Sequence, residues 1–147
     1  MCDSKTCFVN EKSQFQLHLV HWNKKYETPN IAAGHPDGLA VLGLFIEVGD
    51  AHPEFEKVVQ ALEKIKNKNE KVSLEEAKID CAKFLPDKKA AYWTYEGSLT
   101  TPPLLESVIW TVFQDPITIS AEQVNIKKLK MDLKSSNFIE KFSKLRQ

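Results

Sequence analysis

The sequence predicts a single α+β domain, mainly β, and three observations support this fold class. Apolar residues form three strand-like runs, at residues 15–22, 39–49 and 104–113. Helix-start signals occur between and after these runs, namely Pro53 as a first-turn proline and Ser120 in a capping box. The length of 147 residues suits one domain with a modest core. Strands mixed with short helices in this order are typical of the α+β class.

The first run, FQLHLVHW at residues 15–22, has the alternation of a β-strand. Both of its faces are largely apolar, so we expect it to lie centrally in a sheet. His18 and His21 point to opposite faces of such a strand, which excludes a metal site made by these two residues alone. The alternation places Gln16, His18, Val20 and Trp22 on one face, and Phe15, Leu17, Leu19 and His21 on the other.

The next elements combine a loop, a second strand and two helices. Residues 23–38 are polar and contain two prolines and two glycines, which predicts a loop. LAVLGLFIEVG at 39–49 predicts a buried strand, and Pro53 then opens a helix. Ser73 and Glu76 have capping-box spacing, so we expect a short helix there. The apolar stripe of the helix that Pro53 opens consists of Val58, Val59, Leu62 and Ile65.

The second half of the chain is richer in strands. AYWTY at 91–95 predicts a short aromatic strand, and the glycine and Pro-Pro pair of 96–103 predict a loop. LLESVIWTVF at 104–113 predicts a strong strand, with a short strand at 116–120. A Ser/Gln capping box then predicts a helix at 120–129.

Composition excludes several classes of function. Twenty basic and twenty acidic residues cancel, so no net charge favours nucleic acid or an anionic membrane as a partner. No apolar run is long enough to cross a bilayer. Three irregularly spaced cysteines, Cys2, Cys7 and Cys81, favour a reducing compartment. The first residues lack the apolar region of a signal peptide, so we expect a cytoplasmic protein if Met1 is the true start.

Five segments resemble the α-class carbonic anhydrases in order and approximate spacing: LHLVHWN, DGLAVLG, YWTYEGSLTTPPLLE, VIWTVF and EQV. The resemblance covers about residues 4–129. It implies that residues 1–147 form a partial carbonic anhydrase domain, its downstream half, with 130–147 as a degraded or divergent tail. The implied fold is a central, mostly antiparallel sheet with short peripheral helices. The implied activity is reversible hydration of carbon dioxide to bicarbonate by zinc-bound hydroxide.

The resemblance implies that His18 is the third zinc ligand of the family. The first two ligands come from an H-x-H pair on the preceding strand, and such a pair occurs nowhere in this chain. One imidazole does not make a zinc site, so we expect the chain alone to be inactive. Gln16 stands where the family has a glutamate that orients the third ligand. A short alignment also puts Lys5 at the position of a buried family glutamate.

The remaining site residues are also implied by the resemblance. Thr100 matches the threonine that accepts a hydrogen bond from zinc hydroxide and orients it. Tyr95 and Glu106 match supporting positions. Carbon dioxide offers little to hydrogen-bond, so the family holds it against an apolar wall. The wall and pocket positions are Val20, Val41, Leu99, Thr101, Val108 and Trp110.

Plainer interpretations exist for each of these residues. Without the resemblance, His18 is a core histidine, the Thr100-Thr101 pair is turn chemistry, and the wall is ordinary core. His21 is structural, while surface roles suffice for His35 and His52. A second zinc site could use Cys2, Cys7, His18 and His21, but the diverging histidines oppose it.

Two alternatives to the enzyme remain open. Gln16 and Lys5 replace acidic groups, which favours a zinc-less carbonic anhydrase-related binding protein. The second alternative is a non-functional truncated product, whose sheet would expose unpaired strand edges and aggregate.

Overall fold

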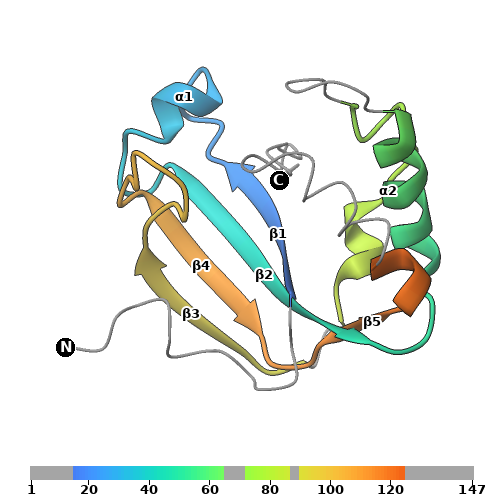
Figure 1. The fold of residues 1–147 in the computed structure, drawn as a ribbon. Coiled ribbons are helices and arrows are strands. Elements are labelled where there is room, and N and C mark those ends of the chain that lie inside the picture. Colours follow the sequence, from blue (N-terminus) through green and yellow to red (C-terminus); the bar gives the residue numbers. More distant parts are fainter. Residues whose placement is uncertain (1–14, 65–71, 87–89, 125–147) are drawn as a thin grey trace.

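A five-stranded mixed sheet organises the fold (Figure 1). The computed structural model describes residues 15–64, 72–86 and 90–124. The strand order is β1-β2-β4-β3, and β5 pairs with β2. The β1–β2 and β3–β4 pairs are antiparallel, whereas β2 pairs with β4 and β5 in parallel. This architecture confirms the predicted α+β, mainly β class. The strands are β1 Phe15–Trp22, β2 Leu39–Val48, β3 Tyr92–Gly97, β4 Val108–Phe113 and β5 Ile117–Ile119.

Strand β1 has the bounds that the sequence predicts, but its place in the sheet differs. Leu17 and Leu19 are buried on one face, while His18 and Val20 are half-buried on the other. In the described part of the chain β1 pairs with β2 alone, at one end of the strand order. The predicted central position is therefore wrong for the sheet as described. Apolar residues on both faces of a strand predict that both faces are buried. They do not predict how many neighbouring strands form hydrogen bonds with its two edges.

The sheet carries a separate hydrophobic core on each face. Helix α2, Pro53–Lys64, lies to one side of the sheet (Figure 1), and its Phe55 and Val59 share a core with residues of β1, β2 and β5. The second core lies on the opposite face. Strand β2 contributes side chains to both cores, because its side chains alternate between the two faces. The α2-side core consists of Leu17, Leu19, Leu44, Ile46, Phe55, Val59, Phe84, Ile117 and Ile119. The opposite core consists of Ala32, Leu39, Val41, Phe45, Val108, Trp110 and Val112.

Helix α2 follows from local signals. Proline occupies its first position, two glutamates lie in its first turn and Lys64 lies in its last, which suits the helix dipole. Of the predicted stripe, Val59 and Leu62 are buried and Val58 is half-buried. Ile65 lies outside the described residues. Phe55, four residues before Val59, continues the buried stripe. No described helix is long and apolar enough to span a bilayer.

Three short elements differ from the predictions. The predicted loop 23–38 contains helix α1, Pro29–Ala32, in which Thr28 accepts a hydrogen bond from the Ile31 N–H at 3.3 Å. The helix predicted at Ser73 forms only a turn, even though Ser73 does accept from the Glu76 N–H at 3.0 Å. That turn ends at Lys78, which has a left-handed φ of 53°. A 3₁₀ helix that was not predicted, η1 (Cys81–Phe84), follows.

Strand β4 begins later than predicted, whereas the predicted capping box at Ser120 is present. Strand β4 starts at Val108, because residues 104–107 belong to the preceding loop. The Ser120 capping box is formed reciprocally: Ser120 Oγ accepts from the Gln123 N–H at 3.3 Å, and Gln123 Oε1 accepts from the Ser120 N–H at 3.1 Å. Residues 121–124 are helical, as predicted, and 125–129 lie outside the described residues.

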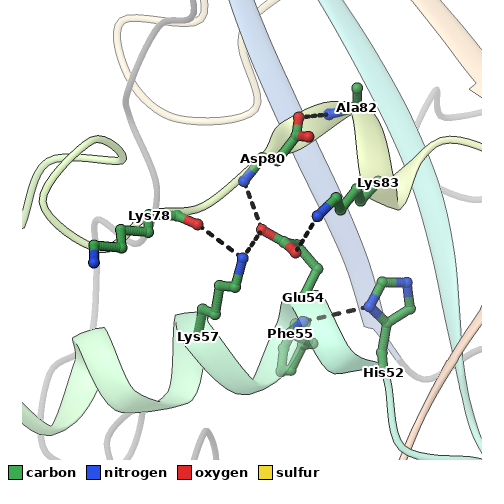
Figure 2. A network of polar contacts seen from close by, with 8 residues as sticks. All are labelled: His52, Glu54, Phe55, Lys57, Lys78, Asp80, Ala82 and Lys83. Carbon is green, nitrogen blue, oxygen red and sulfur yellow. Dashed lines mark hydrogen bonds and ion pairs between the residues drawn. The ribbon is translucent and has the colours of Figure 1, made fainter.

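A buried carboxylate ties α2 to the segment before η1 (Figure 2). Glu54, 3% exposed, accepts a hydrogen bond from the Asp80 N–H at 2.6 Å. Lys57 Nζ lies 3.0 Å from the same carboxylate and also donates to the Lys78 carbonyl at 2.9 Å. The Asp80 hydrogen bond, then Lys57 and Lys83, hold the pKa of Glu54 below its usual range against the effect of burial.

Candidate functional site

The register of the sheet aligns several predicted site residues in one row. Val20 pairs with Val41, Val41 with Trp110, and Trp110 with Tyr95. The row crosses β1, β2, β4 and β3 in turn. Residues paired directly across strands share a face. The face opposite α2 therefore brings these four side chains together, although they are far apart in the sequence.

His18 lies in the next row of the same face. It pairs with Gly43, and Gly43 pairs with Val112. The His18 ring meets Trp110 edge to face, with ring centroids 4.8 Å apart and planes at 75°. Gly43 has no side chain between His18 and Val112. A Cβ at this position would lie 3.3 Å from Val112 Cγ2, which is a tight contact. Sequence reasoning missed Gly43, but a glycine inside a strand is a recognised signal of close approach.

Gln16 determines which nitrogen of His18 carries the proton. His18 Nε2 lies 3.0 Å from Gln16 Oε1. An amide oxygen can only accept a hydrogen bond, so Nε2 carries the proton and the lone pair of the neutral ring falls on Nδ1. A ring nitrogen with a lone pair is the kind of atom that binds a metal. The acceptor is uncharged here, because Gln16 replaces a carboxylate by an amide.

The loop between β3 and β4 lies at the end of this face and is tied to it by Trp110. The indole Nε1 donates to the Ser98 carbonyl at 3.1 Å, and the Leu99 N–H donates to the Leu105 carbonyl at 2.9 Å. Leu99 is half-buried and packs against the core of the face opposite α2. The two following residues, Thr100 and Thr101, are exposed.

The other predicted site residues differ in exposure. Val41 and Val108 are fully buried, whereas Val20 is half-buried. Tyr95 is 40% exposed and stacks on Trp110, with centroids 6.4 Å apart and planes at 11°. Partial burial raises the pKa of Tyr95. Glu106 is exposed at the end of the loop, next to buried Ser107.

The described residues do not fit a complete zinc site. They contain no group of three or more His, Cys, Asp or Glu that could hold a metal ion. His21 is buried on the α2 side of the sheet, and His35 stacks on the Tyr26 ring at 4.2 Å. His52 lies at the start of α2. A catalytic zinc needs three protein ligands, and His18 supplies one.

Several parts of the sequence predictions lie outside the described residues, and the divergent tail predicted at 130–147 is one of them. Cys2 and Cys7, proposed partners of an alternative zinc site, are among them, and so is Lys5. Of that alternative site the structure describes His18 and His21, which lie on opposite faces of β1, as expected.

Known proteins identify the family. The sequence profile of the eukaryotic-type carbonic anhydrases matches residues 3–143. Carbonic anhydrase 7 of Mus musculus is 50% identical over 110 residues, which are 74% of this chain and 40% of that protein. Carbonic anhydrase 7 of Homo sapiens is 50% identical over 112 residues, with the same two shares. The chain thus spans about 40% of the length of these relatives. It belongs to the eukaryotic-type carbonic anhydrase family.

Proposed function

We propose that this chain supplies part of a site for reversible hydration of carbon dioxide to bicarbonate. The observation that carries the proposal is the position of His18, which lies beside Trp110 on the same sheet face as Val20 and Val41. A nonpolar gas and a polar nucleophile need an apolar wall next to a polar group. This face offers both.

Each predicted residue has a role in this proposal. Gln16 fixes the tautomer of His18, and Thr100 orients the attacking oxygen through its hydroxyl group. Tyr95 supports Trp110 by stacking, and Glu106 supports the loop before β4. The substrate pocket consists of Val20, Val41, Leu99, Thr101, Val108 and Trp110.

The chain alone is inactive under the same proposal. The family uses zinc, and the 147 residues contain only four histidines. His21 lies on the opposite face and His52 at the start of α2, while His35 stacks on Tyr26. The described residues contain no group of three metal-binding side chains. Two further ligands must therefore come from outside these 147 residues. Purified chain in excess zinc should hydrate carbon dioxide no faster than buffer in a stopped-flow pH-indicator assay; zinc-dependent, inhibitor-sensitive hydration would contradict this.

A chimaera tests the positive half of the proposal. Residues 15–124 would replace the matching segment of mouse carbonic anhydrase 7, which supplies the rest of the domain. We expect a folded, zinc-loaded chimaera that hydrates carbon dioxide and loses zinc on His18→Ala. His35→Ala is the matched control and should leave both properties unchanged. A folded chimaera whose activity survives His18→Ala would refute the assigned role.

One observation favours a second candidate, a zinc-less binding protein. His18 Nε2 donates to the neutral amide of Gln16, which stabilises a metal-bound imidazole less than a carboxylate does. A chimaera that folds without zinc, and regains zinc when Gln16 is changed to Glu, would support this candidate over the enzyme.

A further inference from the structure

His52 caps the N-terminus of α2 with its imidazole ring. It directly precedes Pro53, and its Nδ1 accepts a hydrogen bond from the Phe55 N–H at 3.3 Å (Figure 2). Its carbonyl accepts from the Glu56 N–H at 3.1 Å, the first bond of the helix. The ring thus satisfies one of the N–H groups that have no partner inside the helix. A histidine can do this only while Nδ1 keeps its lone pair.

The surroundings hold His52 in this position from two other elements. Gln123, 4% exposed, accepts from the His52 N–H and donates to its carbonyl, both at 3.1 Å. The His52 ring also stacks on buried Phe84 of η1, with centroids 5.2 Å apart and planes at 22°. The ring therefore cannot turn away from the Phe55 N–H without leaving Phe84.

Protonation of His52 conflicts with this arrangement. A proton on Nδ1 would point at the Phe55 N–H, so that two donors would face each other. The positive end of the helix dipole disfavours a cation there as well. Burial lowers the pKa of His52, and the Glu54 carboxylate opposes this only in part. The charged residues on the elements around the ring are Glu54, Glu56 and Lys57 on α2, Asp80 and Lys83 at η1, Glu122 in 121–124, and Asp50 before α2.

We propose that His52 is an acid-sensitive latch that releases the N-terminal turn of α2 from Gln123 and Phe84 when it is protonated. The ring is neutral in the latched state and charged in the released state. The latch therefore weakens as the pH falls below the pKa of a free histidine, about 6.5, towards the lower value of the folded protein. Above that range both states are neutral, and pH has no effect through this residue.

Two NMR measurements on the full chain test the latch. The first compares the titration midpoint of His52 in the folded chain with that in the urea-unfolded chain, and we expect a lower midpoint in the folded chain. The second measures the hydrogen-exchange protection factors of the Phe55 and Glu56 amides. One linked proton should lower them by up to about tenfold for each pH unit between pH 6.5 and the titration midpoint of the folded chain, and no further below it.

Variants separate the latch from general acid sensitivity. His52→Asn keeps a side-chain acceptor for the Phe55 N–H but cannot titrate in this range, so its protection factors should stay flat. His35→Asn removes a different histidine and should keep the wild-type slope. Equal midpoints in folded and unfolded chain, or the wild-type slope in His52→Asn, would overturn the proposal.

Discussion

A hydrogen bond from His18 to Gln16 favours one tautomer of that histidine. The amide oxygen of Gln16 fixes the proton on Nε2, and contact with Trp110 fixes the plane of the ring. A side chain that accepts a hydrogen bond from a metal-binding histidine fixes the orientation and the tautomer of its ring. Gln16 gives His18 the orientation and tautomer that a carboxylate would give it, but without the negative charge of a carboxylate.

Removal of this acceptor should change the tautomer of His18. In Gln16→Ala we expect the share of the Nε2-protonated tautomer to fall, because the acceptor that favours a proton on Nε2 is removed. Nitrogen-15 chemical shifts of the ring in the full chain report the two forms. Gln16→Glu keeps an acceptor and should keep the wild-type pattern, and Gln60→Ala changes an exposed glutamine on α2 as the matched control. An unchanged pattern in Gln16→Ala would show that another group sets the tautomer.

At the scale of elements, the end of β3 must lie unusually close to Trp110 of β4. A Cβ on Gly97 would lie 2.9 Å from Trp110 Cδ1 and 3.2 Å from Tyr95 Cε2. Trp110 cannot easily give way, because it is buried and its Nε1 donates to the Ser98 carbonyl. Gly97 thus lets the loop that carries Leu99 and Thr100 start directly above the apolar face.

Gly97→Ala should therefore destabilise the chain. Overpacking of this kind costs about 1–3 kcal/mol, which exceeds the gain of roughly 0.4–1 kcal/mol from a less flexible unfolded chain. Urea unfolding measures the difference, and near-UV circular dichroism should report the displaced Trp110. Gly34→Ala is the control, since a Cβ there meets only the Ile31 carbonyl oxygen at an ordinary 3.4 Å. A Gly97→Ala variant as stable as Gly34→Ala would show that the loop adapts freely.

At the scale of the whole molecule, the half-buried His52 and the buried Glu54 affect the stability of the fold in different pH ranges. The neutral His52 cap weakens as the pH falls below about 6.5. The Glu54 carboxylate has a lowered pKa in the folded protein, so its contribution is complete above the unfolded pKa of about 4.5. It is lost as the pH falls further, through the folded pKa, because the carboxylate must then be protonated.

Glu54→Gln should flatten the acid part of the stability profile. Gln keeps an acceptor for the Asp80 N–H but has no charge to lose, so the loss of stability below about pH 4.5 should shrink. Urea midpoints between pH 3 and 7 measure this. The matched control is Glu63→Gln, on the exposed side of the same helix, which should retain the wild-type slope. An unchanged slope in Glu54→Gln would place the acid sensitivity elsewhere.

The sequence by itself determined the strands β1 and β2, helix α2, the Ser120 capping box and the family. These features are local, since alternation, first-turn proline and capping spacing are set by neighbours in the chain. Motif order likewise singled out His18 and Gln16. Two local predictions failed, the helix at Ser73 and the start of a strand at 104. Each segment contains a residue with left-handed φ, Lys78 at 53° and Leu104 at 60°, which interrupts regular structure.

Only the tertiary structure decided which distant residues meet. The strand register brings Val20, Val41, Trp110 and Tyr95 into one row, and it sets Gly43 opposite His18. Packing also places Gln123 on the backbone of His52, seventy-one residues earlier. The physical reason is that cross-strand pairing and buried polar contacts join segments without any periodicity in the sequence between them.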